Sequence, residues 1–396
     1  MTEQAKVPAI RFAGFTDPWE QRKLIDLVDV LDGDRGKNYP TSDDFDISGH
    51  TLFLNASNVT NDGFLFQDNQ FITEEKSNSM GNGKLEEDDI VVTSRGSLGH
   101  IAWYNADISS FVPYARINSG MLILRNKKEI ETEYLYYFMK SSKGQSQISF
   151  ISFGSAQPQL TKKGVEDLEV ILPTRRDEQV QLGHYFSNLD DLITLHQRKY
   201  DKLVIFKKSM LEKMFPKDGE SVPEIRFAGF TDPWEQRKFS EIVDVCSGRD
   251  YKQLDGGPIP VYGTGGYMTS VSEALSHNRD AIGIGRKGTI DKPYLLKAPF
   301  WTVDTLFYAI PKSDINLEFA LCSFSNVDWK SKDESTGLPS LSKESINETV
   351  LSVPNVVEQN HLGSFFADLD RLITLHQRKL ELLRNIKKSL LDKMFV

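Results

Sequence analysis

The residues of this chain that could do chemistry are polar and aromatic side chains set among glycines. The first half holds the segment LNASNVT and a turn at 95–97, and the second holds YGTGGY at 262–267 followed by the basic pair at 286–287. Arginine pairs with guanine, Asn or Gln with adenine, while Lys and Ser commonly hold phosphates. Turn formation alone explains any one of these residues equally well. The candidates for DNA contact are Asn55, Ser57, Asn58, Arg95, Ser97, Gln157, Gln159, Tyr262, Thr264, Tyr267, Arg286, Lys287 and Ser340.

Motifs for catalysis are weak or missing from the sequence. Residues 283–288 match the G-x-G-x-x-G pattern of dinucleotide sites, but Pro293 follows and favours a turn into a strand over the helix that such a site needs. There is no G-x-x-x-x-G-K-[ST] loop, no H-E-x-x-H and no Asn- or Asp-Pro-Pro-aromatic motif. The acidic run 86–89 could hold Mg²⁺, but adjacent acids before a strand more often form a solvated loop. We therefore predict no catalytic residue, no cofactor and no metal site.

Two long helices of nearly identical sequence must position these clusters. Residues 192–199 and 372–379 both read LITLHQRK, and the similarity extends over 186–215 and 366–395 at a shift of 180. Apolar residues recur at alternating steps of three and four, which is the seam of a left-handed coiled coil. The predicted seam residues are Phe186, Leu189, Ile193, Tyr200, Leu203 and Met210 in the first helix and Phe366, Leu369, Ile373, Leu380, Leu383 and Leu390 in the second. Two such seams in one chain most simply cover each other.

Each seam is interrupted by a histidine and a lysine at matching positions. These are His196 and Lys207 in the first helix and His376 and Lys387 in the second. A polar group at a seam position costs stability but removes alternative alignments, so we interpret all four as register control. Imidazole titrates near neutral pH, which makes a ligand or pH-sensing role the alternative. Against it, a lone seam histidine has no second ligand beside it.

A second repeat divides the chain into two halves. Residues 10–23 and 225–238 both read IRFAGFTDPWEQRK, and each precedes a long block of short apolar runs and turns. The blocks share few letters, but RGSL at 95–98 is echoed by RKGTI at 286–290. This predicts two mixed α+β domains and an internal pseudo-twofold repeat. The expected bounds are 1–177 for the first domain with its opening segment, 178–215 for the first helix, 216–223 for a linker, 224–357 for the second domain and 358–396 for the second helix.

Length and composition set further limits. A chain of 396 residues suits two or three domains, and 39% hydrophobic with 26% charged residues is ordinary for a globular protein. The net charge of -9 argues against a general nucleic-acid coat protein, but the contacting surface of a directed binder can still be basic. The two cysteines lie outside any C-x-x-C spacing, and no apolar run is long enough to span a membrane. We expect a cytoplasmic protein without a membrane partner.

The whole layout resembles the specificity subunit of type I restriction-modification enzymes. The features that carry the resemblance are two variable blocks, each preceded by the shared opening and followed by a helix with LITLHQRK and a KKS-hydrophobic-L-x-KMF ending. The resemblance implies that each block is a target recognition domain that reads one half of a split double-stranded DNA site. It implies an antiparallel coiled coil that sets the gap between the halves. Two methylation subunits are then expected to dock on the shared regions, restriction subunits to join them, and the catalytic sites to lie on these partners.

Two other classes stay open at this point. A stand-alone DNA-modifying enzyme is disfavoured by the missing motifs, and a tandem structural adaptor without a DNA role is supported by the acidic balance. The duplicated docking surfaces should leave the isolated chain poorly behaved. In particular, we expect the seam neighbours Phe206, Leu211 and Leu391 to be exposed.

Overall fold

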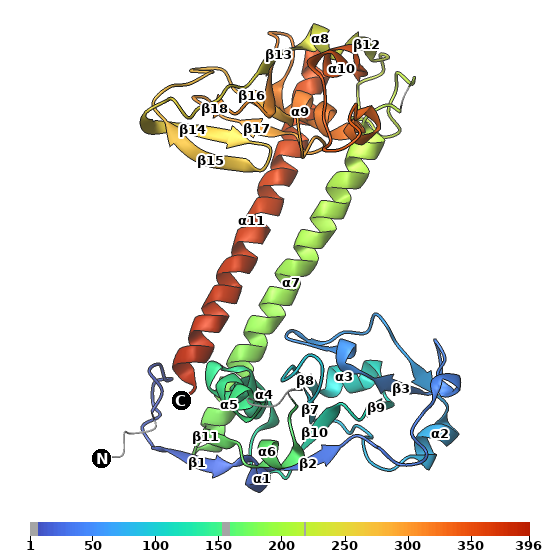
Figure 1. Cartoon of the computed structure of the whole chain (residues 1–396), viewed down its shortest axis with the longest axis vertical. Coiled ribbons are helices and arrows are strands. Elements are labelled where there is room, and N and C mark those ends of the chain that lie inside the picture. The colour runs from blue at the N-terminus through green and yellow to red at the C-terminus, as the bar shows by residue number, and fades with distance from the viewer. Residues whose placement is uncertain (1–6, 153–158, 218) are drawn as a thin grey trace. The chain divides into compact units, whose positions relative to one another are not determined.

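A computed structural model describes residues 7–152, 159–217 and 219–396, which form two compact units. Unit 1 consists of Met1–Leu195 together with Leu380–Val396, and unit 2 is the continuous stretch His196–Lys379. Two helices of 39 residues, α7 (Arg176–Met214) and α11 (Val356–Met394), each contribute a segment to both units (Figure 1). Unit 1 is therefore completed by the last residues of the chain.

Unit 1 is organised around a four-stranded antiparallel sheet in the order β2-β10-β7-β8. All residues of the inner strand β7 are buried. Alternate side chains face opposite sides of the sheet, and a core covers each side. Ile90 and Val92 enter a core shared with the helices, while Val91 enters a second core with Leu52 and Leu54. The strands of this sheet are β2 (Val28–Asp32), β10 (Met121–Asn126), β7 (Asp89–Thr93) and β8 (Ile101–Tyr104).

Shorter strands and helices surround this sheet. The other strands are β1 (Trp19–Lys23) paired with β11 (Glu169–Pro173), β3 (Thr51–Leu54) between β6 (Phe71–Ile72) and β9 (Ala115–Ile117), and β4 (Val59–Thr60) paired with β5 (Gly63–Phe64). The helices are α1 (Leu24–Leu27), α2 (Glu74–Ser79), α3 (Ala106–Phe111), α4 (Thr132–Lys140), α5 (Ser142–Ser152) and α6 (Lys162–Glu166), with 3-10 turns η1 (Ser42–Asp44) and η2 (Ala56–Asn58).

Unit 2 repeats this plan with a sheet in the order β13-β19-β16-β17. Its main strands are β13 (Val243–Ser247), β19 (Leu306–Pro311), β16 (Ala281–Gly285) and β17 (Tyr294–Leu296). The other strands are β12 (Glu235–Lys238) paired with β20 (Val350–Val353), and β14 (Gly256–Gly263) between β15 (Gly266–Val271) and β18 (Trp301–Thr302). The helices are α8 (Phe239–Ile242), α9 (Leu317–Asn326) and α10 (Lys343–Glu348), with the 3-10 turn η3 (Trp329–Lys332).

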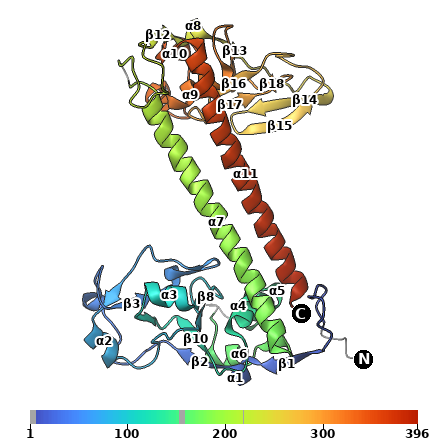
Figure 2. The same cartoon turned by 180° about the vertical axis from the view of Figure 1, so that it is seen from behind.

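The repeated opening segment ties one long helix to the other within each unit. In unit 1 the Ile10 amide donates to the Lys393 carbonyl near the end of α11, at 3.0 Å. Arg11 then donates through Nε (2.6 Å) and a terminal nitrogen (2.8 Å) to the two carboxylate oxygens of Glu178 near the start of α7. The opening segment from residue 10 thus packs beside the end of α11, as seen from behind in Figure 2.

Unit 2 contains the same tie. Ile225 donates its amide to the Lys213 carbonyl near the end of α7, at 2.9 Å. Arg226 donates to both carboxylate oxygens of Glu358 near the start of α11, at 2.7 and 2.8 Å. Identical opening sequences therefore make identical contacts, although one belongs to the chain terminus and the other to an internal turn.

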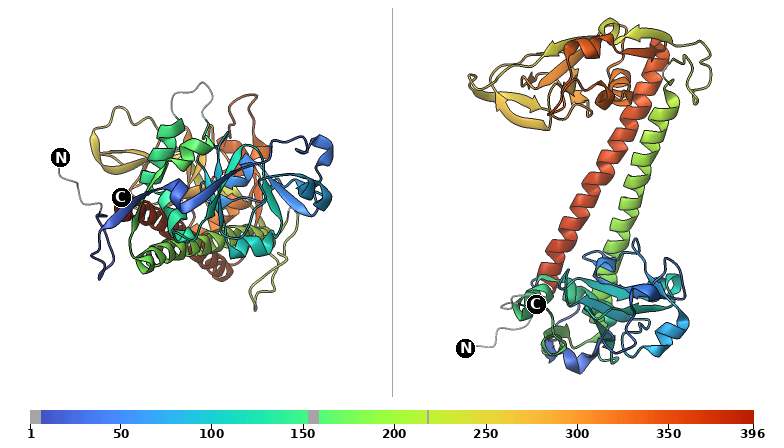
Figure 3. Two further views of the ribbon diagram at one scale, coloured as in Figure 1. Left: turned by 90° about the horizontal axis from the view of Figure 1, so that it is seen from below. Right: turned by 45° about the vertical axis from the view of Figure 1, so that its right-hand side comes forward.

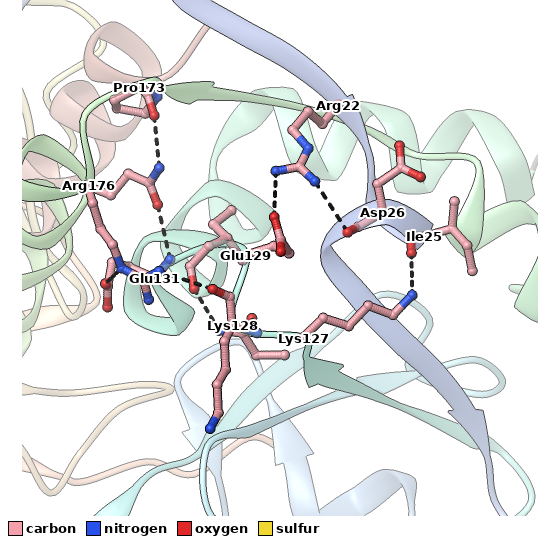
Figure 4. A network of polar contacts seen from close by, with 12 residues as sticks. Arg22, Ile25, Asp26, Lys127, Lys128, Glu129, Glu131, Pro173 and Arg176 are labelled. Atoms are coloured by element: carbon pink, nitrogen blue, oxygen red, sulfur yellow. Dashed lines mark hydrogen bonds and ion pairs between the residues drawn. The ribbon is translucent and has the colours of Figure 1, made fainter.

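A polar network fastens the opening strand of unit 1 to the loop after β10 (Figure 4). Arg22 pairs with Glu129 at 3.2 Å, and Lys127 donates to the Ile25 carbonyl at 2.7 Å. The first residue of α7, Arg176, pairs with Glu131 of the same loop. One loop therefore positions both the opening strand and the start of the long helix.

Candidate nucleic-acid interface and helix surfaces

Three segments of unit 1 meet at the end of strand β7. The amides of Ser94 and Arg95 both donate to the Gly120 carbonyl, at 2.8 and 3.2 Å. The Leu160 amide in turn donates to the Ser94 carbonyl at 3.0 Å. We call these segments, residues 94–97, 118–120 and 159–160, the loop cluster of unit 1.

Two candidate residues from different segments touch within this cluster. Arg95 donates through Nε to the Gln159 side-chain oxygen at 3.1 Å, and both residues are exposed. Ser97 is exposed on the same turn, next to Gly96, whose φ of +75° favours glycine. No acidic side chain in the described part of the chain forms an ion pair with Arg95. Gln157 lies outside the residues that the structure describes.

Unit 2 has an equivalent loop cluster, formed by residues 286–289, 303–305 and 340–341. The amides of Arg286 and Lys287 donate to the Thr305 carbonyl at 2.8 and 3.3 Å, and the Leu341 amide donates to the Arg286 carbonyl at 3.0 Å. The strand registers agree, because Thr93 faces Met121 in unit 1 and Gly285 faces Leu306 in unit 2. These hydrogen bonds make Lys287 the counterpart of Arg95. The match of Arg95 with Arg286 suggested by the sequence echo is therefore off by one residue.

The two basic residues of this cluster have different surroundings. Arg286 donates to the Asp304 carbonyl at 3.4 Å, and its guanidinium carbon lies 5.7 Å from the Phe307 ring centre. Lys287 is exposed and forms a β-bridge with Ser340, which is half-buried. Both side chains are exposed, but that of Arg286 lies against the Phe307 ring. Within the described ranges, Lys287 forms no ion pair and its ammonium can contact a ligand.

The glycine-rich segment of unit 2 forms the β14–β15 hairpin. Tyr262 is half-buried with its ring 6.2 Å from that of Tyr294, while Tyr267 is 63% exposed. Thr264 at the turn helps to line a cavity of about 560 Å³ with Asp304 and Thr305. The cavity joins the hairpin to the loop cluster of the same unit.

The Asn-rich segment of unit 1 is largely occupied by its own turn. Asn55 accepts hydrogen bonds from the amide (2.9 Å) and hydroxyl (2.7 Å) of Ser57, which is exposed. Asn58 is only 1% exposed and donates its amide to the Leu65 carbonyl at 3.1 Å. Asn58 therefore shapes the turn and does not present its amide to solvent.

The acidic run before β7 is not a solvated loop as a whole. Asp89 is 1% exposed and accepts from Arg125 at 2.9 and 2.7 Å, and Glu86 pairs with the same arginine. Burial raises the pKa of Asp89 despite this pairing. The guanidinium already fills the space between these carboxylates. Among the residues with described positions, no three His, Cys, Asp or Glu side chains gather as a metal site would need.

The seam residues of both helices are all buried or half-buried. Phe186, Leu189, Phe366, Leu369 and Leu380 are buried. The others are half-buried: Ile193, Tyr200, Leu203, Met210, Ile373, Leu383 and Leu390. The expectation for the seam neighbours was wrong at Leu391, which is buried in the core of unit 1. Phe206 is 43% exposed and Leu211 is half-buried.

The polar seam residues pair with partners on the opposite helix. In unit 2, Lys207 donates to both carboxylate oxygens of Asp370, at 2.6 and 2.8 Å. In unit 1, Lys387 pairs with Asp190, which is the same contact with the two helices exchanged. The seam histidines are not isolated, contrary to expectation, because His196 and His376 contact each other in unit 2. Figure 3 shows the helix segments of both units from two further directions.

Each unit also carries an exposed apolar surface on its helix segments. In unit 1 it consists of Leu192, Leu195, Leu382 and Ile386. In unit 2 it includes Leu372, Leu375 and Phe206, which are the counterparts of Leu192, Leu195 and Ile386 at a shift of 180. Val204 and Ile205, next to Phe206, are exposed as well. We call these the helix surfaces of the two units. No helix in the described ranges is long and apolar enough to cross a membrane.

The sequence-family model named type I restriction modification DNA specificity domain matches residues 16–204 and 231–385 of this chain. The chain belongs to this family. The MjaVIII type I restriction enzyme specificity subunit of Methanocaldococcus jannaschii is 24% identical over 316 residues, covering 70% of this chain and 72% of the relative. The putative MjaX specificity subunit of the same organism is 21% identical over 423 residues, covering 95% and 92%.

Solved structures show the same fold. The S subunit of a type I restriction-modification system from M. genitalium superposes with a TM-score of 0.65 at 18% identity, covering 98% of this chain and 99% of that one. A chain from a study of complex assembly in a type I restriction-modification system gives a TM-score of 0.53 at 14% identity, covering 95% and 97%. The predicted fold class, with two tandem mixed domains and two long helices, is confirmed.

Proposed function

We propose that this chain is the DNA-specificity subunit of a type I restriction-modification system, in which each unit reads one half of a bipartite double-stranded DNA site. The observation that carries the proposal is that two blocks of different sequence form equivalent loop clusters, each with an exposed basic residue. Equivalent backbones with different side chains suit one task performed on two different sequences. The family match over both blocks supports the same conclusion.

In this role the chain binds and positions but does not catalyse. Methyl transfer and cleavage would belong to partner subunits, which is in line with the match to a DNA specificity domain. The loop clusters offer guanidinium, ammonium, amide and hydroxyl groups, which suit base edges and phosphates. The chain would therefore set where the partners act.

The helix surfaces support docking of two copies of one methylation subunit. Leucines at 192 and 195 in unit 1 recur at 372 and 375 in unit 2, so a partner that fits one surface fits the other. Exposed apolar side chains that gather on one surface commonly mark protein interfaces. Restriction subunits would then join through the docked methylation subunits.

The paired long helices would set the gap between the two half-sites. Each helix has 39 residues, and at 1.5 Å per residue this corresponds to roughly 58 Å. Seam contacts on both helices would keep this length fixed. A change in helix length should alter the gap and leave the half-sites unchanged.

Replacement of one block tests the reading of DNA. The chain is produced with its methylation subunit, and methylated adenines are mapped in cellular DNA. Exchange of residues 239–357 for the block of a relative should change one half of the site and preserve the other half and the gap. A change in both halves would contradict independent reading. If the complex shows no salt-dependent affinity for DNA, the adaptor without a DNA role becomes the better explanation.

Charge substitutions on the helix surfaces test the docking of two partners. Leu195→Asp in unit 1 and Leu375→Asp in unit 2 should each remove one methylation subunit, and the double variant should remove both. Both leucines are about half exposed, so the fold should tolerate the change. Light scattering of the purified complex gives the stoichiometry. A complex that keeps two partners in the double variant would exclude these surfaces.

A further inference from the structure

The two loop clusters present one residue position in the same way. The carbonyl of the residue before position 95 accepts from the Leu160 amide, and the carbonyl before position 287 accepts from the Leu341 amide. In each unit the amide of this preceding residue and the amide of position 95 or 287 donate to one common carbonyl. Both are followed by a glycine with positive φ, +75° at Gly96 and +91° at Gly288. That conformation favours glycine and turns the chain sharply after the basic residue. A ligand bound in the same manner to both units would therefore meet positions 95 and 287 in equivalent places.

The side chains at this position differ in a way that matters for recognition. Arg95 uses its Nε to donate to Gln159, which leaves both terminal nitrogens of the planar guanidinium unoccupied by any acidic side chain in the described part of the chain. An arginine restrained in this way presents a fixed fork, and such a fork matches the N7 and O6 acceptors of guanine. Lys287 offers a single compact charge on a flexible stem, beside the hydroxyl-bearing Ser340.

We propose that Arg95, oriented by Gln159, reads a guanine in the half-site of unit 1, while Lys287 holds a phosphate at the equivalent position of unit 2. The proposal rests on the proposed function and assigns it to particular side chains. Gln159 is a positioning residue, because its oxygen holds the Nε and leaves the fork for the base. The two units would therefore contact their half-sites through equivalent positions, but only the contact of Arg95 would depend on the DNA sequence.

The test maps methylated adenines in cells that produce the complex with single variants. Arg95→Ala should relax discrimination at one G·C pair of one half-site by roughly 10- to 100-fold, since a bidentate contact of this kind distinguishes a guanine from other bases to about that extent. Arg95→Lys keeps the charge but not the fork and should relax the same pair. The half-site concerned should be the one left unchanged when block 239–357 is replaced.

Variants at Gln159 test whether this residue orients the Arg95 guanidinium or only stabilises the loop. Gln159→Leu removes the acceptor for the Arg95 Nε and should relax the same G·C pair. Gln159→Asn keeps an uncharged amide oxygen and should preserve more of the preference than Gln159→Leu. A structural role alone would reduce methylation at all sites together and would not single out one base pair.

Lys287→Ala should act differently from the arginine variants. Loss of a phosphate contact weakens binding to all sequences and lowers the slope of log affinity against log salt by about one, without changing the preferred bases. Lys128→Asn serves as the control in unit 1, because Lys128 is exposed at the far end of β10 from the loop cluster. This control should leave the site, its discrimination and the salt slope unchanged.

The outcomes distinguish this proposal from the function on which it rests. If Arg95→Ala and Arg95→Lys leave every position of both half-sites unchanged, or relax an A·T pair, the guanine assignment fails. If Lys287→Ala changes base preference, the phosphate assignment fails. The proposed function fails separately if the unaltered complex methylates no bipartite site or if block replacement changes nothing.

Discussion

His196 and His376 meet through their Nδ1 atoms, which lie 2.9 Å apart in unit 2. The two residues are 180 positions apart, so one residue of the repeat contacts its own counterpart. A hydrogen bond between two Nδ1 atoms needs one donor and one acceptor, and two protonated rings cannot form it. The pair therefore admits one proton between these atoms.

Acid should weaken the helix pair through these histidines. Burial, together with the positive charges of Lys379, His376 and Lys199, lowers the pKa of His196 below its usual value of 6.5. A group with a lowered pKa in the folded state takes up its proton more readily when unfolded. The stability it contributes is thus present above pH 6.5 and lost as the pH falls below that value. Thermal melting of the complex at several pH values measures this loss.

Removal of both imidazoles identifies the source of the pH dependence. The double variant His196→Leu/His376→Leu should melt at a temperature that changes less between about pH 7 and pH 5 than that of the unaltered chain. His277→Gln is the control, because His277 is an exposed histidine of the same unit. An unchanged pH profile in the double variant would exclude the pair.

The exchanged lysine contacts should differ in strength. Lys387 and Asp190 are 14% and 34% exposed, whereas Lys207 and Asp370 are 25% and 46% exposed. Asp190 also accepts from the Tyr137 hydroxyl at 2.8 Å. Lys387→Ala should cost roughly 1–3 kcal/mol, between the values for exposed and buried pairs, and Lys207→Ala should cost less. Chemical denaturation with a double-mutant cycle through Asp190→Ala measures the coupling. Equal losses from both lysine variants would contradict the expectation.

Gly33 and Gly248 should not tolerate alanine. They are 215 positions apart, the same shift as the repeated opening segment. A Cβ would lie 2.1 Å from the Asn118 carbonyl oxygen at Gly33 and 2.0 Å from that of Val303 at Gly248. Since backbone must move in both cases, each alanine should cost roughly 1–3 kcal/mol or more.

The effect of these glycine variants should also be local. Asn118 and Val303 belong to the loop clusters, so Gly33→Ala should weaken discrimination in one half-site and Gly248→Ala in the other. Methylation mapping reads out both. Gly256→Ala is the control, because nothing lies within 4 Å of its added Cβ, and it should leave stability and site unchanged.

Phe395 should be essential for unit 1 although it is the second-last residue. It is 2% exposed and its ring centre lies 5.3 Å from that of Tyr134 and 5.5 Å from that of Phe186. Phe395→Ala should cost roughly 3–5 kcal/mol, as expected for a large buried aromatic. Phe150→Ala makes the same change at a side chain that is 83% exposed. Denaturation that shows similar losses for both variants would contradict this placement.

The repeats in the sequence predicted two tandem domains because the opening segment and the long helix each occur twice, with similar turn residues between them. Periodicity located both long helices, and turn residues located the strands on either side of the loop clusters. Periodicity could not show which residues beside a seam become buried, because their burial depends on which side chains from the rest of the unit pack against them. Leu391 is covered by the core of unit 1, while Phe206, at a comparable distance from its seam, is not.

The loop clusters were the least predictable part. Arg95 and Arg286 share a letter, but the backbone hydrogen bonds to Gly120 and Thr305 make Lys287 the counterpart of Arg95. One additional residue before the glycine in the second block shifts the match, and only the strand register reveals it. The contact of Arg95 with Gln159 joins positions 64 apart, and no local pattern could indicate it.

Unit 1 combines residues 1–195 with residues 380–396, and this determines which unit the ribosome completes first. Unit 2 uses one continuous stretch, so all its residues have been made when codon 379 has been read. Unit 1 begins first but lacks Phe395 and the Lys393 carbonyl that accepts from Ile10 until codons 393–395 are translated. The ring contacts of Phe395 with Tyr134 and Phe186 therefore form only after all of unit 2 has been synthesised. A premature stop anywhere in codons 380–396 would therefore damage the half of the protein that was started first.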